Sequence, residues 1–415
     1  MFKEIKKCRV CGSPNLELVF DLGIQSLTGV FPKRKNQKIT QGPIQLVRCS
    51  GQNTCGLVQL KQSYDMEEMY GLNYGYRSGL NASMVSHLHS KVDKILRSNL
   101  LSDGDLIIDI GSNDGTTLRS YPPGHFKLIG VDPTGVKFAH YYPSDISLIS
   151  DFFSGEIIKR NFGSIKARVI TSFSMFYDLE DPITFAKEVE SVLDDNGVWI
   201  LEQSYLPSML KNNSFDTICH EHLEFYGLKQ IIWIVEEAGL CVKDLEFNEI
   251  NGGSFSIEVV KKGSKHLLNK NKIEQVLKNE QSLGLEDGSA FIDFRKQITE
   301  EKEKLLNLLG KLKKDNKKVV GLGASTKGNV LLQYCEIGPD LLSCIAEVNK
   351  DKFGCYTPNT LIPLVDEKTV LKSNPDYFLV LPWHFKPYFL NSKKLAGHKL
   401  IFPLPKLEVL DVPSK

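Results

Sequence analysis

The sequence predicts an α/β protein of several domains, built mainly on parallel sheets. In two regions, short apolar runs typical of buried strands alternate with helix-length segments, which indicates βαβ units. The 415-residue length exceeds what one hydrophobic core usually serves. In addition, four cysteines lie in a loop-rich amino-terminal stretch, which marks a small separate unit.

These patterns divide the chain into three expected domains, residues 1–80, 81–262 and 263–415. Apolar residues between 291 and 312 recur near helical spacing, so a long amphipathic helix should lead into the last domain. The expected strands are 16–20 and 44–48 in the first domain, 106–110, 127–131, 169–173 and 198–202 in the second, and 319–322, 343–347, 377–381 and 400–402 in the third.

Composition excludes several classes of protein. Lys and Arg number 51 against 50 Asp and Glu, which does not suggest a nucleic-acid-binding protein. No signal-peptide block and no apolar run of membrane-spanning length is evident, so we expect a cytoplasmic protein that acts away from membranes, as a monomer. Nine cysteines, an odd count, suit a reducing compartment.

The cysteine cluster predicts a structural zinc site. Cys8 and Cys11 form a tight knuckle, and Cys49 and Cys55 could complete four thiolates around one zinc ion. The second pair has five intervening residues, which is wider than usual, so Cys49 is the weakest candidate. Unliganded cysteines in a loop-rich terminus are the alternative.

A glycine turn follows the first strand of the second domain. Gly111 and Gly115 would let the backbone approach a ligand closely, a helix should start near Thr116, and Asp132 ends the next strand, where it could accept hydrogen bonds from a ribose. The three-glycine dinucleotide pattern is absent. Asp109 would repel a pyrophosphate but could hold a cationic methionyl group.

This loop resembles that of class I S-adenosylmethionine (SAM) methyltransferases; an ordinary βα turn is the alternative. The residues assigned to the cofactor are Asp109, Gly111, Ser112, Asn113, Gly115 and Asp132.

Two further segments carry chemistry. His220 and His222 flank Glu221; their spacing does not match zinc-protease motifs, so general acid/base catalysis is favoured over metal binding, and a pair of structural histidines is the alternative. In residues 319–329 a strand, a glycine turn, hydroxyls and Lys327 suit a diphosphate, although the domain could serve packing alone. Trp383-His384 also follows a strand, with no role assigned.

Together these motifs resemble the three-domain sugar C-methyltransferases of deoxysugar biosynthesis, over essentially the whole chain. That family has a zinc domain, a methyltransferase domain with a class I Rossmann-like sheet, and a Rossmann-like carboxy-terminal domain that helps bind the nucleotide. The motifs are the cysteine pairs and residues 74–78, 109–115, 175–182, 220–222, 251–254 and 321–329.

The resemblance implies a nucleotide-linked 4-keto sugar as substrate. His222 would remove the proton next to the ketone, and the resulting enolate would take the methyl group from SAM. His220 and Glu221 would orient the base, and Tyr76 would line the sugar site. Family members can carry Tyr where this chain has Cys219.

The remaining expected substrate contacts surround these groups. Tyr177 or Tyr226 could replace the missing hydroxyl, Ser325 and Lys327 would lie near phosphate, and Glu347 near the ribose or base. The full set expected to bind substrate is Tyr74, Tyr177, Tyr226, Ser325, Lys327, Asn329 and Glu347.

Two other functions stay open at this point. One is O- or N-methylation of a similar sugar, for which no enolate is needed. The other is an NAD-binding or nucleotide-sugar-binding protein without methyl transfer, which the missing three-glycine pattern and Asp109 disfavour.

Overall fold

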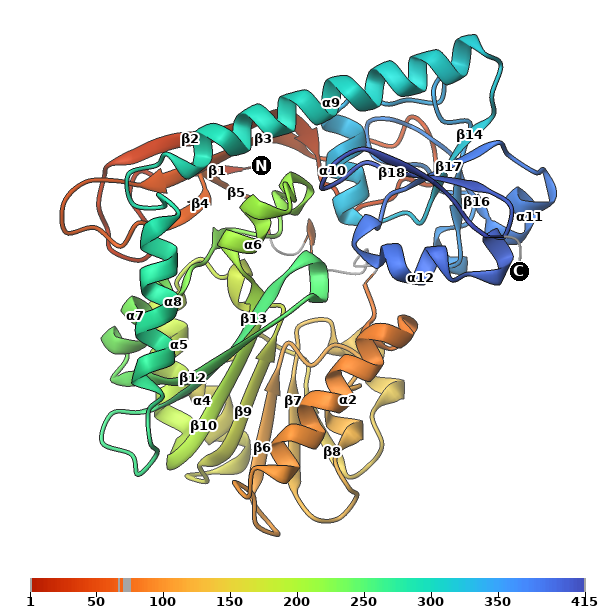
Figure 1. Ribbon diagram of the computed structural model, residues 1–415. Helices are drawn as coiled ribbons and strands as arrows, with labels where there is room; N and C mark the ends of the chain where they lie inside the picture. The colour runs from red at the N-terminus through yellow and green to blue at the C-terminus, as the bar shows by residue number, and fades with distance from the viewer. Residues whose placement is uncertain (1, 66–67, 70–75, 414–415) are drawn as a thin grey trace.

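A seven-stranded sheet forms the middle of the chain in the computed structural model, which describes residues 2–65, 68–69 and 76–413 (Figure 1). The strand order is β12-β13-β10-β9-β6-β7-β8. The strands from β8 to β10 run parallel, and β13 is antiparallel to both neighbours. The strands are β6 (Leu106–Ile110), β7 (Lys127–Val131), β8 (Ile146–Ile149), β9 (Ala167–Phe173), β10 (Leu193–Ser204), β12 (Leu240–Asn248) and β13 (Ser254–Lys261).

Helices accompany this sheet, as the alternating pattern predicted. All five residues of β6 are buried, which explains why its sequence is a continuous run with little polar alternation. The helices of this part are α2 (Ala82–Arg97), α3 (Gly135–Phe138), α4 (Gly155–Phe162), α5 (Pro182–Val192), α6 (Leu206–Lys211), α7 (Leu228–Glu237) and α8 (Lys270–Ser282).

The helix expected near Thr116 does not form. The chain makes only the 3-10 turn η2 (Leu118–Ser120) before the next strand. The Asp114 carboxylate accepts hydrogen bonds from the backbone and hydroxyl of Thr116, and Pro122-Pro123 disfavours helical backbone at the residue before it. Local side-chain bonding and the two prolines therefore outweigh the helical tendency.

The amino-terminal unit is a small antiparallel sheet completed by a strand from the central unit. Its order is β11-β4-β3-β2, and β11 is the pair Glu224–Phe225, which lies directly after the His-Glu-His segment. The other strands of this sheet are β2 (Leu16–Ser26), β3 (Gln41–Cys49) and β4 (Val58–Leu60). Strands β1 (Lys3–Glu4) and β5 (Gln62–Ser63) pair with each other in a separate two-stranded sheet.

The carboxy-terminal unit is the second expected parallel sheet. Its order is β16-β15-β14-β17-β18-β19, with only β19 antiparallel to its neighbour. Its strands are β14 (Val319–Leu322), β15 (Ile345–Glu347), β16 (Leu364–Asp366), β17 (Tyr377–Val380), β18 (Lys399–Phe402) and β19 (Glu408–Asp411), and its helices are α10 (Thr326–Tyr334), α11 (Glu367–Lys372) and α12 (Lys386–Leu390).

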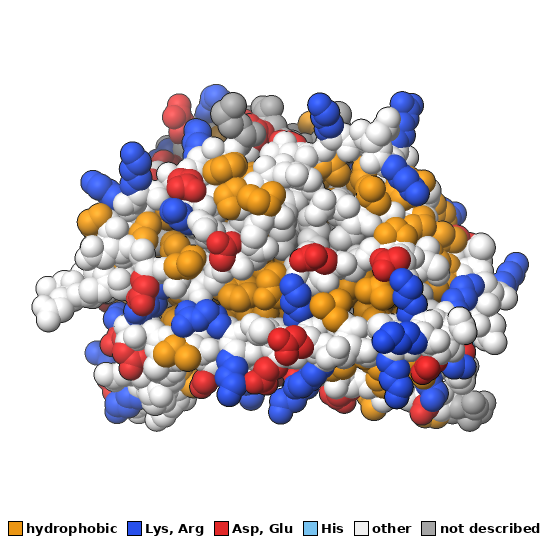
Figure 2. Space-filling model, turned by 90° about the horizontal axis from the view of Figure 1, so that it is seen from above, with side chains coloured by type: hydrophobic (Ala, Val, Ile, Leu, Met, Phe, Trp, Pro, Cys, Tyr) orange, Lys and Arg blue, Asp and Glu red, His pale blue; other side chains and the backbone are white. Residues whose placement is uncertain are grey.

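The long helix α9 (Ala290–Lys314) spans the amino- and carboxy-terminal units along one side of the molecule (Figure 1). Its buried face carries the apolar residues that predicted it, apart from Leu308, which is partly exposed. One buried member is charged: Glu301 accepts a hydrogen bond from the backbone N–H of Leu407 at 2.7 Å. On the face seen from above, basic and acidic side chains are interspersed (Figure 2).

The three units share their cores. One apolar cluster joins residues of β2 to β4, the segment 206–225 and the carboxy-terminal sheet, and a second joins the four cysteines to the central sheet. Helix α8, beyond the predicted boundary at 262, packs against β12 and α7 of the central unit. None of the helices in the described part of the chain is long and apolar enough to cross a membrane.

Candidate active site between the three units

The glycine turn after β6 lies at the carboxyl edge of the central sheet. Gly111 and Gly115 both have φ of +73°, a backbone conformation that favours glycine. A Cβ on Gly111 would come within 2.9 Å of the Met175 side chain, and one on Gly115 within 3.1 Å of the Tyr142 ring. Both positions therefore need glycine for conformation and for space.

Asp109 is a buried carboxyl group at the end of β6. Its side chain is 3% exposed and accepts a hydrogen bond from the Thr171 hydroxyl at 2.5 Å. Burial raises the pKa of this carboxyl to about 7, against the smaller opposing effect of the threonine hydrogen bond. A cation placed nearby would favour its ionised form.

Asp132 holds the turn in place. Its carboxylate accepts hydrogen bonds from the backbone N–H groups of Asn113 at 2.8 Å and Thr134 at 2.7 Å. On the other side, the Tyr142 hydroxyl donates to the Ser112 hydroxyl at 2.8 Å. The predicted cofactor residues therefore lie together at the carboxyl ends of β6 and β7, and Tyr142 contacts the loop between these strands.

The residues just before α2 lie over this loop. The N–H of Ser78 donates to the Asn113 side chain at 2.9 Å, and the N–H of Gly79 donates to Asp114 at 3.1 Å. Tyr76 lies beside them, and 47% of its surface is exposed. Tyr74 falls outside the described residues.

His222 has one ring nitrogen fixed and the other available. Its Nδ1 lies 2.9 Å from the backbone carbonyl of Thr217, and because a carbonyl only accepts, Nδ1 carries the proton and Nε2 the lone pair. The ring packs on that of Tyr177, with centroids 4.3 Å apart. Burial, and next the positive charge of Lys327, lower the pKa of His222 to about 3.

Lys327 brings the carboxy-terminal unit to this histidine. Its ammonium donates to the backbone carbonyl of Asn251 at 2.8 Å. Burial lowers its pKa, and the nearby Asp216 carboxyl opposes that effect. The base candidate and this cation therefore face each other across the junction of the central and carboxy-terminal units.

His220 and Glu221 point toward the amino-terminal unit. His220 is completely buried, its ring edge lies against Tyr64 with centroids 4.6 Å apart, and its Nδ1 is 3.5 Å from the Thr28 hydroxyl. The same hydroxyl donates to Glu221 at 3.4 Å. These contacts hold the segment against the amino-terminal unit, and neither side chain has a described hydrogen bond to His222.

The strand β11 attaches the histidine segment to the amino-terminal sheet. The N–H of Leu60 donates to the carbonyl of Leu223 at 2.8 Å, and Leu223 donates to the carbonyl of Tyr177 at 2.8 Å. Arg9, which lies in the cysteine knuckle, donates to the Leu60 carbonyl at 2.6 Å and to Glu180 at 3.1 Å. The knuckle is thus two contacts away from the residue after His222.

The four cysteines form a site suited to zinc. All four sulfur atoms lie within 4.8 Å of one another, with Cys8 and Cys55 3.5 Å apart and Cys11 and Cys49 3.4 Å apart. Tetrahedral zinc with Zn–S bonds of about 2.3 Å places its sulfurs about 3.8 Å apart. The donor set fits a closed structural zinc site, and Cys49 joins it despite the wide spacing.

Most predicted residues of the carboxy-terminal loop support the loop itself. Ser325 caps α10 by accepting from the Gly328 N–H at 3.0 Å. Glu347 is 5% exposed and accepts from the Ala324 N–H at 3.1 Å. Asn329 donates to the Thr28 carbonyl at 2.7 Å. Of this predicted group, Lys327 is the one whose charge acts on His222.

The two tyrosines proposed to replace a lost hydroxyl differ in position. Tyr177 packs on His222, whereas Tyr226 is completely buried against Phe176, with ring centroids 5.5 Å apart. In this conformation Tyr226 offers no surface to a substrate. Cys219 is also completely buried.

Sequence reasoning missed several residues of the site. The Asn251 carbonyl accepts a hydrogen bond from Lys327, the Asp216 carboxyl acts on the Lys327 charge, and Trp383 donates to Asp216. Asn251 and Trp383 lay in segments already singled out, but none of the three was assigned a role. The signal for Trp383 was its place after a strand, at the carboxyl edge of a parallel sheet, where ligands bind in such folds.

Comparison with known protein families accounts for the three units. Residues 8–70 match the model of a zinc binding domain, residues 84–245 that of a methyltransferase domain, and residues 249–405 that of a C-methyltransferase C-terminal domain. The chain is a three-domain SAM-dependent methyltransferase. Its cofactors are SAM and zinc, as the sequence predicted, and its central sheet is that of class I methyltransferases.

This methyltransferase is 27% identical over 420 residues to the C-methyltransferase NovU of Streptomyces niveus, covering 99% of this chain and 98% of the relative. Solved structures align with less of it. A SAM-dependent methyltransferase of Clostridium acetobutylicum covers 42% of the chain and 91% of its own length, with 15% identity and a TM-score of 0.33. An O-methyltransferase family protein of Burkholderia thailandensis covers 44% and 59%, with 18% identity and a TM-score of 0.34.

Proposed function

We propose that this methyltransferase transfers the methyl group of SAM to a carbon next to the ketone of a nucleotide-linked sugar, with His222 as the base. The observation that carries the proposal is the hydrogen bond from His222 to the Thr217 carbonyl, which leaves Nε2 free to accept a proton. The match to a C-methyltransferase C-terminal domain and the likeness to a C-methyltransferase support carbon as the acceptor.

The chemistry needs a base that stays neutral. His222 has a pKa well below its usual range, so it is unprotonated throughout the physiological range. Nε2 takes the proton from the carbon next to the ketone, and the electron pair moves onto the carbonyl oxygen to give an enolate. SAM, held by the loop after β6, would supply an electrophilic methyl group to the enolate carbon; the ketone would be restored, S-adenosylhomocysteine would leave, and His222 would then release its proton to solvent.

The positive charge of Lys327 suits the negative substrate. An anionic group next to the ammonium would offset its charge, and this would raise the pKa of His222 toward its usual range once substrate is bound. The base would therefore strengthen when a diphosphate or a developing enolate is present. Of the residues expected to bind substrate, Lys327 is the one that carries a positive charge, so we assign the main anion contact to it.

The cofactor side of the proposal uses the loop after β6. Asp109 would face the cationic part of the methionyl group, and Asp132, whose carboxylate already fixes the loop, would face the ribose. Tyr76 would lie between cofactor loop and sugar, since its neighbours hydrogen-bond to that loop.

The test is incubation with SAM and a panel of nucleotide-linked 4-keto sugars in deuterated water, followed by mass spectrometry and carbon NMR. We expect a new C–CH3 signal that is lost in His222→Ala. The control His125→Ala, which alters an exposed histidine distant in sequence from His222, should keep the signal. An O–CH3 or N–CH3 signal would contradict carbon as the acceptor. Unchanged transfer by His222→Ala would contradict its role as base.

A further inference from the structure

His384 is partly buried and carries a buried ring nitrogen that the proposed reaction does not use. It lies in a 3-10 turn, η8 (Trp383–Phe385), directly after β17. Its Nδ1 is buried and has no hydrogen-bond partner among the described residues. A buried ring nitrogen without a hydrogen-bond partner destabilises the folded protein, so we look for its partner on a bound ligand.

The turn that carries His384 packs directly on the loop that carries Lys327. A Cβ on Gly323 would come within 2.9 Å of Pro382, and one on Gly328 within 2.9 Å of Leu381. Strands β14 and β17 are parallel neighbours, so their carboxyl ends lie side by side. Ligands bind at such carboxyl ends in open α/β sheets. His384 and Lys327 therefore belong to one sheet edge.

Trp383 fixes this turn against the central unit. Its indole N–H donates to the Asp216 carboxylate at 2.8 Å, and a Cβ on Gly252 would lie 3.7 Å from its ring. Gly252 is the neighbour of Asn251, whose carbonyl holds Lys327. The turn therefore reaches the same junction that holds His222, and the contacts on Trp383 set the direction of the next residue.

We propose that His384 contacts the substrate and, together with Lys327, binds one of its anionic oxygens through an N–H at Nδ1. The proposal rests on the proposed function, because it takes the anion from a nucleotide-linked keto sugar. Burial, and then the charge of Lys327, lower the pKa of His384 well below its usual range, so the ring is neutral and offers one N–H donor. Two substrate groups have the required chemistry, the diphosphate and the enolate oxygen.

The test compares His384→Phe, which removes the donor, with His384→Gln, which keeps one. The matched control is His398→Gln, a histidine of the same unit whose Nδ1 already donates to the Pro375 carbonyl at 3.3 Å. Calorimetry measures binding of uridine and thymidine diphosphates. NMR in deuterated water, with S-adenosylhomocysteine in place of SAM, measures proton exchange at the carbon next to the ketone. Binding of S-adenosylhomocysteine reports that each variant is folded.

Loss of one hydrogen bond to an anion lowers an affinity or a rate by about 10- to 100-fold. If His384 binds the diphosphate, His384→Phe weakens nucleoside diphosphate binding by that factor. If His384 binds the enolate oxygen, nucleoside diphosphate binding is unchanged and proton exchange slows by that factor. His384→Gln restores part of the loss. Unchanged binding and exchange in His384→Phe would overturn the inference while leaving the proposed function intact. If the wild-type protein shows neither nucleoside diphosphate binding nor proton exchange, the proposed function and the role of His384 are both overturned.

Discussion

The pKa of Asp109 predicts how cofactor binding depends on pH. A carboxylate attracts the cationic methionyl group only when it is ionised, and burial raises the pKa of this carboxyl to about 7 in the free protein. As pH falls below that value, a growing fraction of the protein must lose a proton before the cofactor binds. We therefore predict that the affinity for SAM falls as pH falls, and levels off above neutral pH.

The magnitude follows from the same pKa. Each pH unit below about 7 reduces the ionised fraction about tenfold, so at pH 5.5 the affinity should be about 30-fold lower than at pH 8, or about 2 kcal/mol. Calorimetry from pH 5.5 to 8.5 measures this directly, and proton release on binding at pH 6 gives a second readout. The same experiment with S-adenosylhomocysteine tests the methionyl ammonium, which both molecules carry.

Two variants separate Asp109 from other titrating groups. Asp109→Asn should bind weakly at all pH values, with a flat profile. Thr171→Val removes the hydrogen bond that stabilises the ionised carboxyl, so the profile should shift to higher pH. A flat wild-type profile, or a Thr171→Val profile shifted to lower pH, would refute the reasoning.

Three further predictions test other parts of the site. Removal of zinc by a chelator should lower the melting temperature and raise hydrogen exchange in residues 215–227, whereas Cys241→Ser, outside the cluster, should retain one zinc per chain by elemental analysis. Lys327→Met should raise the pKa of His222 measured by NMR titration, yet leave it below 6.5 because burial is the larger cause; a lower pKa would contradict this. Glu202→Gln should lower the free energy of unfolding, measured in urea, by about 3 kcal/mol, and Glu246→Gln should lower it by less than about 1 kcal/mol. Equal losses would contradict the larger contribution of the buried carboxylate.

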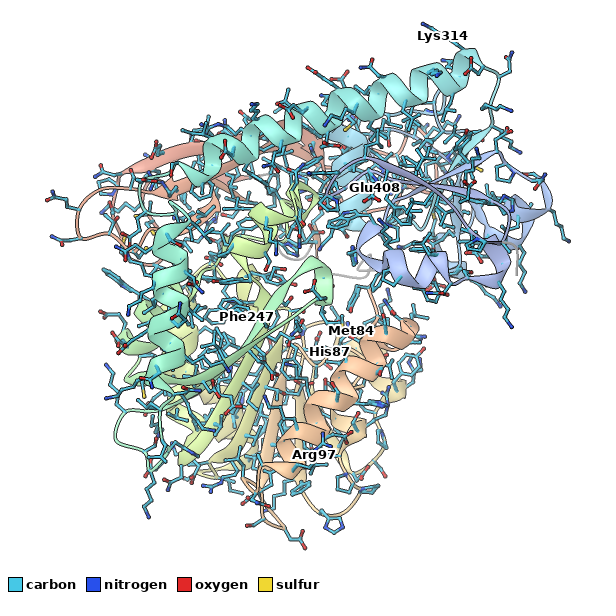
Figure 3. All side chains as sticks on the ribbon, in the orientation of Figure 1. Met84, His87, Arg97, Phe247, Lys314 and Glu408 are labelled. Atoms are coloured by element: carbon cyan, nitrogen blue, oxygen red, sulfur yellow. The ribbon has the colours of Figure 1, made fainter. Side chains whose placement is uncertain are left out.

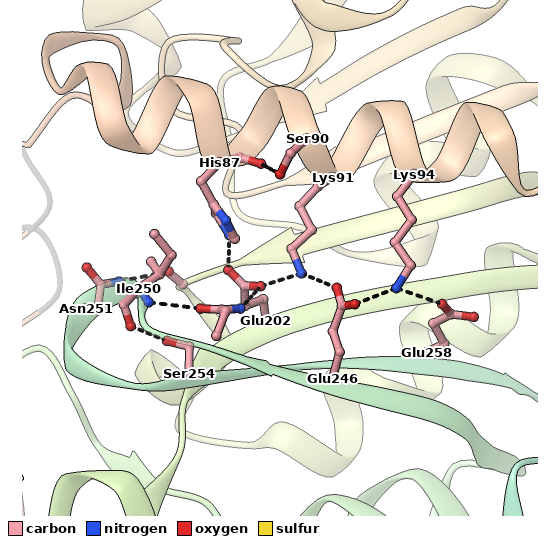
Figure 4. A network of polar contacts seen from close by, with 12 residues as sticks. His87, Ser90, Lys91, Lys94, Glu202, Glu246, Ile250, Asn251, Ser254 and Glu258 are labelled. Atoms are coloured by element: carbon pink, nitrogen blue, oxygen red, sulfur yellow. Dashed lines mark hydrogen bonds and ion pairs between the residues drawn. The ribbon is translucent and has the colours of Figure 1, made fainter.

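The network around Glu202 explains that last difference. Its carboxylate is 2% exposed, at the carboxyl end of β10, and contacts His87 at 2.5 Å, Lys91 at 2.6 Å and Asn248 at 2.8 Å (Figure 4). His87 lies toward the end of α2 nearest the carboxy-terminal unit, whereas Arg97 lies at the opposite end (Figure 3). The Glu202→Gln change removes the negative charge that pairs with buried Lys91 and turns one acceptor oxygen into a donor among other donors, whereas Glu246 is partly in water.

The sheets could be predicted because their strands carry the signal locally. The predicted 106–110, 127–131 and 319–322 match β6, β7 and β14 residue for residue, since runs of buried branched residues between turn signals have few other solutions. The two-residue strand β11 could not be predicted. Its partner β4 lies more than 160 residues earlier, and nothing in two residues specifies that pairing.

The candidate site divides in the same way. Residues 109–115 and Asp132 were predictable because one strand, one turn and the next strand bring them together. The surroundings of His220 and His222 were not, because His220 contacts Thr28 and Tyr64 of the amino-terminal unit, and the pKa of His222 depends on Lys327 of the carboxy-terminal unit. A motif gave the residue types, and contacts distant in sequence determine which side chain faces the site.

These contacts also give a physical reason for three units in one enzyme. The segment that carries His222 begins after β10 of the central sheet, but it is held by β4 on one side and lies near the charge of Lys327 of α10 on the other. Asn329 of α10 in turn bonds to Thr28, which contacts both His220 and Glu221. The central sheet carries the proposed cofactor loop, but it does not by itself position His222, the proposed base. The amino-terminal unit supplies that position, and the carboxy-terminal unit supplies the charge that adjusts the basicity of His222.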